Sequence, residues 1–109
     1  MNTKTVDIAF LKTELIRRLK SLNPIKIILF GSYVYGEPNE NSDIDICIVN
    51  SGNLQKMEKK RTIRVLLKDL NIAKDILTPS EKEYNFYKTE FGSIYKEIDE
   101  KGEILWQNS

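Results

Sequence analysis

Apolar residues recur at steps of three and four near the start of the chain. From Val6 to Leu22 they form one stripe, made of Ile8, Leu11, Leu15, Leu19 and Leu22. This period is that of an amphipathic helix with a single buried face. Asn23-Pro24 follows the stripe, and a residue that precedes proline avoids the helical conformation. The pattern therefore predicts a first helix that ends at this point.

Two apolar segments then predict strands. Residues 26–30 (KIILF) contain an apolar run that is too short for a helix and rich in β-branched residues, which is typical of a buried strand. Residues 43–49 (DIDICIV) alternate strictly, so that the isoleucines lie on one face and the aspartates, Cys47 and Val49 on the other. We expect the isoleucine face to point into the core.

The next segments continue the alternation of helix and strand. Residues 50–53 (NSGN) form a turn signal, and an imperfect helical stripe runs from Leu54 to Leu70. Residues 72–77 (IAKDIL) predict a third strand, although a continued helix fits the same letters.

Capping residues predict where the last helix begins and ends. Thr78 is expected to be its N-cap, with Pro79 at the first helical position and Glu81 completing a capping box. One long helix would run to about Glu100, with Gly92 inside it. Residues 101–102 predict the C-cap, and residues 103–106 predict a short edge strand.

Length and composition agree with one domain. The chain has 109 residues, of which 40% are hydrophobic and 30% charged, and a chain of this size buries about two thirds of its surface. No apolar run approaches the roughly 18 residues of a membrane span. The net charge of +1 gives no overall attraction to nucleic acid, so no direct nucleic-acid partner and no membrane partner are expected. We expect an α/β domain over residues 1–109, with one sheet covered by helices.

The residue types that are absent restrict the chemistry. The chain has no histidine, which excludes a Ser-His-Asp triad, a Cys-His pair and an imidazole metal site. Carboxylates become the first candidates for acid, base and metal-ligand roles. Cys47 has no candidate base nearby and is expected to be a packed side chain. A single cysteine forms no internal disulfide, and the first residues lack the pattern of a signal peptide, so a cytoplasmic location is expected.

Residues 31–45 (GSYVYGEPNENSDID) contain the candidate site. A strand that ends in Gly31-Ser32 offers backbone N–H groups and a hydroxyl to an anion, and the glycine permits close approach of a phosphate. Asp43 and Asp45 project from one face of a strand with Cα atoms about 6.5–7 Å apart, so their carboxylates can converge on a hard cation. If the third strand lies beside the second, Asp75 adds a carboxylate that could bind a second metal ion or accept a proton.

The spacing of these residues resembles a known signature. Gly31-Ser32, ten further residues and then Asp43-Ile44-Asp45 are similar to the GSx₁₀DxD motif of the nucleotidyltransferase superfamily that includes DNA polymerase beta. The order of elements is similar almost end to end to its minimal nucleotidyltransferase (MNT) branch. The resemblance implies a polymerase beta-like α/β (α+β) fold, with a small mixed sheet, helices packed on one face and the active site on the other.

The same resemblance implies roles for single residues. Gly31, Ser32 and Ser42 would contact the nucleotide, with capping of the loop as the alternative for Ser42. The metal ligands and catalytic residues would be Asp43, Asp45 and Asp75, holding two Mg²⁺ ions with ATP as substrate. One departure concerns Val34 and Tyr35, which stand where the family often has a small residue and an arginine. Without that charge, Tyr33 or Tyr35 is left to stack on a base or donate a hydrogen bond.

The length and the resemblance together suggest a protein partner. One domain leaves no room for a second domain that presents the acceptor. The resemblance implies the antitoxin of a HEPN–MNT toxin–antitoxin pair, which transfers AMP from ATP to a tyrosine hydroxyl of its partner, a HEPN-domain RNase toxin, within a hetero-oligomer. Two alternatives remain open: a binding-only antitoxin that masks its partner, and a nucleotidyltransferase that acts on a small molecule of the aminoglycoside type.

Two surface features each have two interpretations. A basic stretch is expected to be a solvated helix face, with partner docking as the alternative; it comprises Lys56, Lys59, Lys60, Arg61 and Arg64. The aromatic residues of the last helix are expected to be core and rim residues, with a partner interface as the alternative; they are Tyr84, Tyr87, Phe91 and Tyr95.

Overall fold

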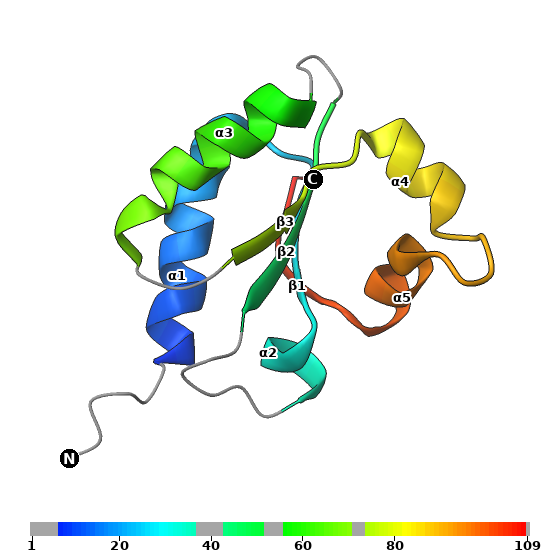
Figure 1. The fold of residues 1–109 in the computed structure, drawn as a ribbon, viewed down its shortest axis with the longest axis horizontal. Coiled ribbons are helices and arrows are strands. Elements are labelled where there is room, and N and C mark those ends of the chain that lie inside the picture. Colours follow the sequence, from blue (N-terminus) through cyan, green and yellow to red (C-terminus); the bar gives the residue numbers. More distant parts are fainter. Residues whose placement is uncertain (1–6, 37–42, 52–55, 71–73, 109) are drawn as a thin grey trace.

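The computed structural model describes residues 7–36, 43–51, 56–70 and 74–108. Figure 1 shows a sheet seen nearly edge-on, with α1 and α3 on one side of it and α4 and α5 on the other. In chain order the elements are α1 (Ile8–Leu19), the 3₁₀ turn η1 (Lys20–Leu22), β1 (Lys26–Phe30), α2 (Ser32–Tyr35), β2 (Ile44–Val49), α3 (Lys56–Leu66), the 3₁₀ turn η2 (Lys68–Leu70), β3 (Lys74–Leu77), α4 (Glu81–Tyr87), α5 (Ile94–Lys101) and β4 (Glu103–Gln107).

The sheet is mixed, with strand order β3-β2-β1-β4. β1 pairs antiparallel with both β2 and β4, whereas β2 and β3 are parallel. Parallel neighbours need a long crossover connection, which here includes α3. The predicted third strand and the predicted edge strand at the carboxyl end are both confirmed.

The first face of the sheet is covered by α1 and α3. Leu11, Leu15 and Leu19 of α1 are buried against the isoleucines of β2, which confirms the predicted orientation of that strand. Asp7 caps α1 by accepting a hydrogen bond from the Phe10 amide at 3.0 Å. Among the described helices, none combines the length and the apolar character that crossing a bilayer requires.

The second face of the sheet is also covered, by α4 and α5. Cys47 and Val49 of β2 are buried there together with Tyr84 of α4 and Ile98 of α5. The expectation that helices pack on one face only is therefore wrong in this detail, because β2 is apolar on both faces beyond Asp45. Cys47 is a packed side chain, as predicted, and burial, with the nearby charge of Glu83, raises the pKa of its thiol to about 12.

The predicted last helix is two helices. α4 ends at Tyr87, and α5 begins after Ser93, whose side chain accepts a hydrogen bond from the Tyr95 amide at 3.0 Å. Gly92 lies between them with φ +82°, a left-handed conformation that a continuous helix cannot contain. Two helices, rather than one, therefore cover this face of the sheet.

The residues that begin this segment also differ from the prediction. The N-cap of α4 is Ser80, which accepts from the Glu83 amide at 3.0 Å, and not Thr78. The predicted cap is two residues early because the parallel pairing of β2 and β3 continues as a bridge between Asn50 and Ser80. Thr78 is consequently buried beside the sheet.

Candidate functional site

Three strand ends meet at one end of the sheet, below which α2 lies in Figure 1. The last residue of β1, Phe30, pairs with Asp45 near the start of β2. In the parallel register of β2 and β3, Asp45 lies opposite Asp75, and neighbouring strands are about 4.8 Å apart. The fold therefore brings Asp75 beside Asp45, far from it in the sequence, and Asp45 next to Gly31.

Gly31 and Asp45 are in direct contact. A Cβ atom built on Gly31 would lie 1.9 Å from Asp45 Oδ2 and 2.9 Å from Asp45 Cγ. Gly31 also has φ +77°, in the left-handed region that side chains disfavour. The sequence suggested that this glycine permits the approach of a phosphate, whereas the structure gives the space above its α carbon to the Asp45 carboxylate.

The carboxylates affect one another electrostatically. Asp45 is half-buried, whereas Asp43 and Asp75 are exposed. Burial, followed by the negative charges of Asp75 and Asp43, raises the pKa of the Asp45 carboxyl above its ordinary value. The Asp45 carboxylate is therefore repelled by its two neighbours, and a bound cation would relieve that repulsion.

The donor set at this site fits Mg²⁺. Asp43, Asp45 and Asp75 offer only carboxylate oxygens, which are the protein ligands that Mg²⁺ prefers. Within the described ranges, no group of three or more Asp, Glu or Cys side chains is arranged to hold a metal ion by itself. Mg²⁺ is usually held by one or two carboxylates together with substrate phosphates, so an all-protein cage is not required.

The short helix α2 presents Tyr35 and hides Tyr33. Tyr33 is buried in the core, and within the described residues its hydroxyl has no hydrogen-bond partner; burial raises the pKa of that hydroxyl. Stacking of Tyr33 on a base, one of the sequence-based alternatives, is therefore wrong. Tyr35 is 46% exposed and remains available for such contacts. Ser42 lies outside the described residues.

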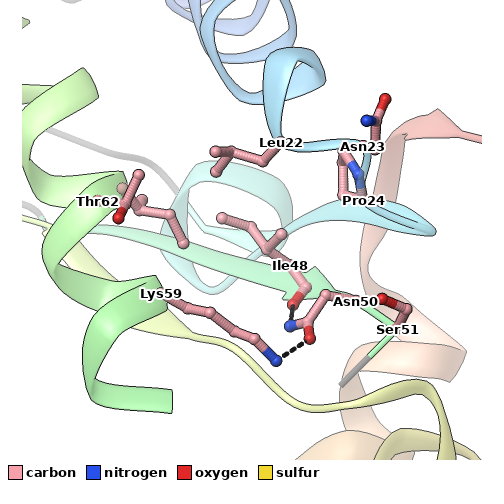
Figure 2. Close-up of a pocket in the computed structure, with 9 residues that line it drawn as sticks. Leu22, Asn23, Pro24, Ile48, Asn50, Ser51, Lys59 and Thr62 are labelled. Carbon is pink, nitrogen blue, oxygen red and sulfur yellow. Dashed lines mark hydrogen bonds between the residues drawn. The ribbon is translucent and has the colours of Figure 1, made fainter. Parts of the chain in front are cut away.

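A pocket of about 280 Å³ lies at the opposite end of the sheet (Figure 2). Lys59 donates a hydrogen bond to the Asn50 side chain, which in turn donates to the Ile48 carbonyl at 3.4 Å. Asn50 is five residues along the chain from Asp45, or about 17 Å in an extended strand, so the pocket is separate from the carboxylates. Sequence patterns do not reveal this pocket, because its walls come from three separate segments, around Leu22, Asn50 and Thr62.

A family model of the nucleotidyltransferase domain matches residues 12–105, which include Gly31, Asp45 and Asp75. The chain belongs to the nucleotidyltransferase domain family. It is 36% identical over 81 residues to a Methanocaldococcus jannaschii protein named "Putative protein adenylyltransferase", an alignment that covers 74% of this chain and 77% of the relative. The predicted family and the predicted enzyme class, nucleotidyltransferase, are thereby confirmed.

Solved structures share the fold of this family member. One is a toxin–antitoxin complex with AMP-PNP, similar with a TM-score of 0.65 and 23% identity over 90% of this chain and 74% of that chain. Another is a complex of tri-AMPylated Shewanella oneidensis HEPN toxin with MNT antitoxin, with a TM-score of 0.61 and 20% identity over 93% of this chain and 73% of that chain. At these identities the likeness establishes the nucleotidyltransferase fold, as predicted, while the roles of single residues stay predictions.

Proposed function

We propose that this nucleotidyltransferase is a Mg²⁺-dependent protein adenylyltransferase. It transfers AMP from ATP to a tyrosine hydroxyl of a partner HEPN-domain RNase toxin and so acts as an antitoxin. The whole of residues 1–109 would form a single MNT domain, which would work in a hetero-oligomer in the cytoplasm. Family membership supports the reaction class, and the name of the Methanocaldococcus jannaschii relative supports a protein acceptor. The observation that carries the proposal is the position of Asp45, against Gly31 and opposite Asp75.

Nucleotide binding is assigned to the Gly31-Ser32 turn and the first two aspartates. The amides of Val34 and Tyr35 already donate to the Gly31 carbonyl, at 3.0 and 3.1 Å, so phosphate contacts would come from the Ser32 hydroxyl and the amides before Val34. Asp43 and Asp45 would hold Mg²⁺, which neutralises charge on the triphosphate when bound. Tyr35 would contact the base, which its exposure on α2 permits.

Asp75 is assigned to the acceptor side because it is exposed on the edge strand β3. Its carboxylate would accept the proton of the partner's tyrosine hydroxyl. The tyrosine oxygen then bonds to the α-phosphorus, the bond from that phosphorus to the bridging oxygen breaks, and pyrophosphate leaves toward Gly31-Ser32. Holding the two reactants in line is the main contribution that such a site can make.

The test is transfer of label from α-labelled ATP, with Mg²⁺, into a lysate of the source organism. Wild type is compared with Asp43→Asn, Asp45→Asn and the control Glu58→Gln, which changes an exposed carboxylate in the first turn of α3, at the other end of the sheet. We expect one labelled protein band with wild type and the control, absent with both aspartate variants, and mass spectrometry to place AMP on a tyrosine.

Other outcomes would overturn this proposal. Label that does not depend on the aspartates would refute their assigned roles. If no protein is labelled in an aspartate-dependent way, then a small-molecule acceptor or a binding-only antitoxin would replace the proposal.

A further inference from the structure

The outer face of α3 carries cations that have no ion-pair partner in the described part of the chain. Lys60, Arg61, Arg64 and Lys68 line one shallow hollow of about 520 Å³ on this face, together with Val65. The predicted basic stretch is therefore divided: Lys59 turns away to Asn50, and Lys68 of η2 joins Lys60, Arg61 and Arg64. We call the five residues that line this hollow the α3 basic surface.

Most described ion pairs lie elsewhere. Lys12 pairs with Glu103, Arg17 with Glu14, and Lys96 with Glu100. Arg18 pairs with Glu14 and with Asp69, just beyond the α3 basic surface. Residues four apart on a helix are neighbours, so Lys60 and Arg64 repel each other, and Lys68 of η2 adds a further positive charge to the same hollow. Folding alone gives no reason to gather unpaired cations in this way.

The helix that presents this surface is firmly held. Ile63 and Leu67, on its inner side, are almost completely buried in the core. The Arg18 guanidinium donates to the Leu66 carbonyl at 2.9 Å and also binds Asp69, which fixes the end of the helix to α1. A rigid face of this kind can bind a partner without first becoming ordered.

Val65 distinguishes between two classes of anionic partner, a nucleic acid and an acidic protein segment. It is 68% exposed in the middle of the cations, and a β-branched aliphatic side chain gains nothing from contact with a phosphodiester backbone. An amphipathic helix can instead cover Val65 with its apolar stripe while the polar side chains on its flanks meet the cations. Charge complementarity then requires that the rim of this partner be acidic.

We propose that the α3 basic surface docks an acidic, amphipathic helical segment of a protein partner. The inference rests on the proposed function only for the class of partner, a protein. The docking surface lies on the outer side of α3, whereas Asp45 shares the other sheet face with α4 and α5, so docking and transfer use separate residues.

The test is a titration, without nucleotide, of three fluorescent probes followed by anisotropy. The first probe is a synthetic peptide of Glu and Leu in helical heptads, about five turns long. The second has the same composition with the apolar stripe scrambled, and the third is an oligouridylate of similar charge. The proteins are wild type, the double variant Arg61→Glu/Arg64→Glu, the single variant Val65→Ser, and the control Lys82→Glu/Lys101→Glu. The control changes net charge equally at exposed positions of α4 and α5.

We expect wild type and the control to bind the amphipathic peptide alike. Binding should weaken about tenfold or more in Arg61→Glu/Arg64→Glu, and severalfold in Val65→Ser. Thermal melts confirm that each variant folds. If the scrambled peptide binds as tightly as the amphipathic one, the surface attracts acidic peptides by charge alone, and the proposal is overturned. Tighter binding of oligouridylate, unaffected by Val65→Ser, would replace it with a nucleic-acid site, and the absence of binding by any probe would also refute it. None of these outcomes depends on whether AMP is transferred.

Discussion

Gly31→Ala tests the contact on which the candidate site depends. The substitution lowers the stability of the fold through the backbone, because Gly31 has φ +77°. An alanine at φ +77° and ψ −153°, a combination essentially confined to glycine, costs about 1–3 kcal/mol, and each kcal/mol lowers the Tm of a domain of this size by about 4–8 °C. From this conformational cost alone we expect the Tm to fall by about 4–24 °C.

The substitution also lowers the rate of AMP transfer, because it displaces the Asp45 carboxylate. The new Cβ atom would lie 1.9 Å from Asp45 Oδ2, whereas ordinary van der Waals contact begins at 3.4 Å. The carboxylate oxygen must therefore move by about 1.5 Å, and a misplacement of about 1 Å in an active site can cost on the order of 100-fold in rate. We expect AMP transfer to fall by about 100-fold or more.

Gly92→Ala is the matched control. Gly92 has a similar φ of +82°, but nothing lies within 4 Å of a Cβ built there. The Gly92→Ala variant should also lose Tm, because its φ is positive, but it should keep the wild-type rate of transfer. Circular dichroism melts and transfer of labelled AMP below both Tm values provide the two measurements. A Gly31→Ala variant that transfers AMP at the wild-type rate, or a Gly92→Ala variant as slow as Gly31→Ala, would refute the reasoning.

Three further predictions concern charge, the core and the docking surface. Because burial and its neighbours raise the pKa of Asp45 above 3.8, its ionised form destabilises the fold at neutral pH. Asp45→Asn should therefore raise the Tm at pH 7, with the gain vanishing as the pH falls through that raised pKa to below 3.8; a lower Tm at pH 7 would contradict this. Tyr84→Phe removes the hydrogen bond to Asp99 at 3.0 Å and should cost about 0.5–1.5 kcal/mol in urea unfolding, whereas no loss would show that water replaces the bond. Arg61→Glu/Arg64→Glu should raise the KM for the protein acceptor about tenfold with kcat unchanged, and a lower kcat would place these arginines in the chemical step instead.

The site residues that sequence analysis identified are those whose positions follow from local pattern. The alternation around Asp43 and Asp45 fixes their common face, and the Gly-Ser turn follows directly from the strand before it. Asp75 required one long-range assumption, that β3 lies beside β2, which the parallel register satisfies. The contact between Gly31 and Asp45 could not be predicted, because it depends on the antiparallel register of β1 and β2.

The errors arose where tertiary contacts override local preference. Thr78, Pro79 and Glu81 fit a capping box, but continued pairing with β2 delays the helix until Ser80 becomes its cap. Periodicity places Gly92 inside one long helix, because a single sequence does not reveal that its φ is +82°. The expectation that helices cover only one face of the sheet is wrong because α4 and α5 pack on Cys47 and Val49 of β2.

The division of the carboxylates between two strands has a consequence for local stability. Asp45 belongs to β2, which is paired on both sides, whereas Asp75 belongs to β3, a four-residue strand at the edge of the sheet. Edge segments open at a lower free energy than the global unfolding of a domain. Detachment of β3 alone would separate Asp75 from Asp45 while the rest of the protein stays folded. The assembled site therefore persists only as long as its weakest strand remains paired.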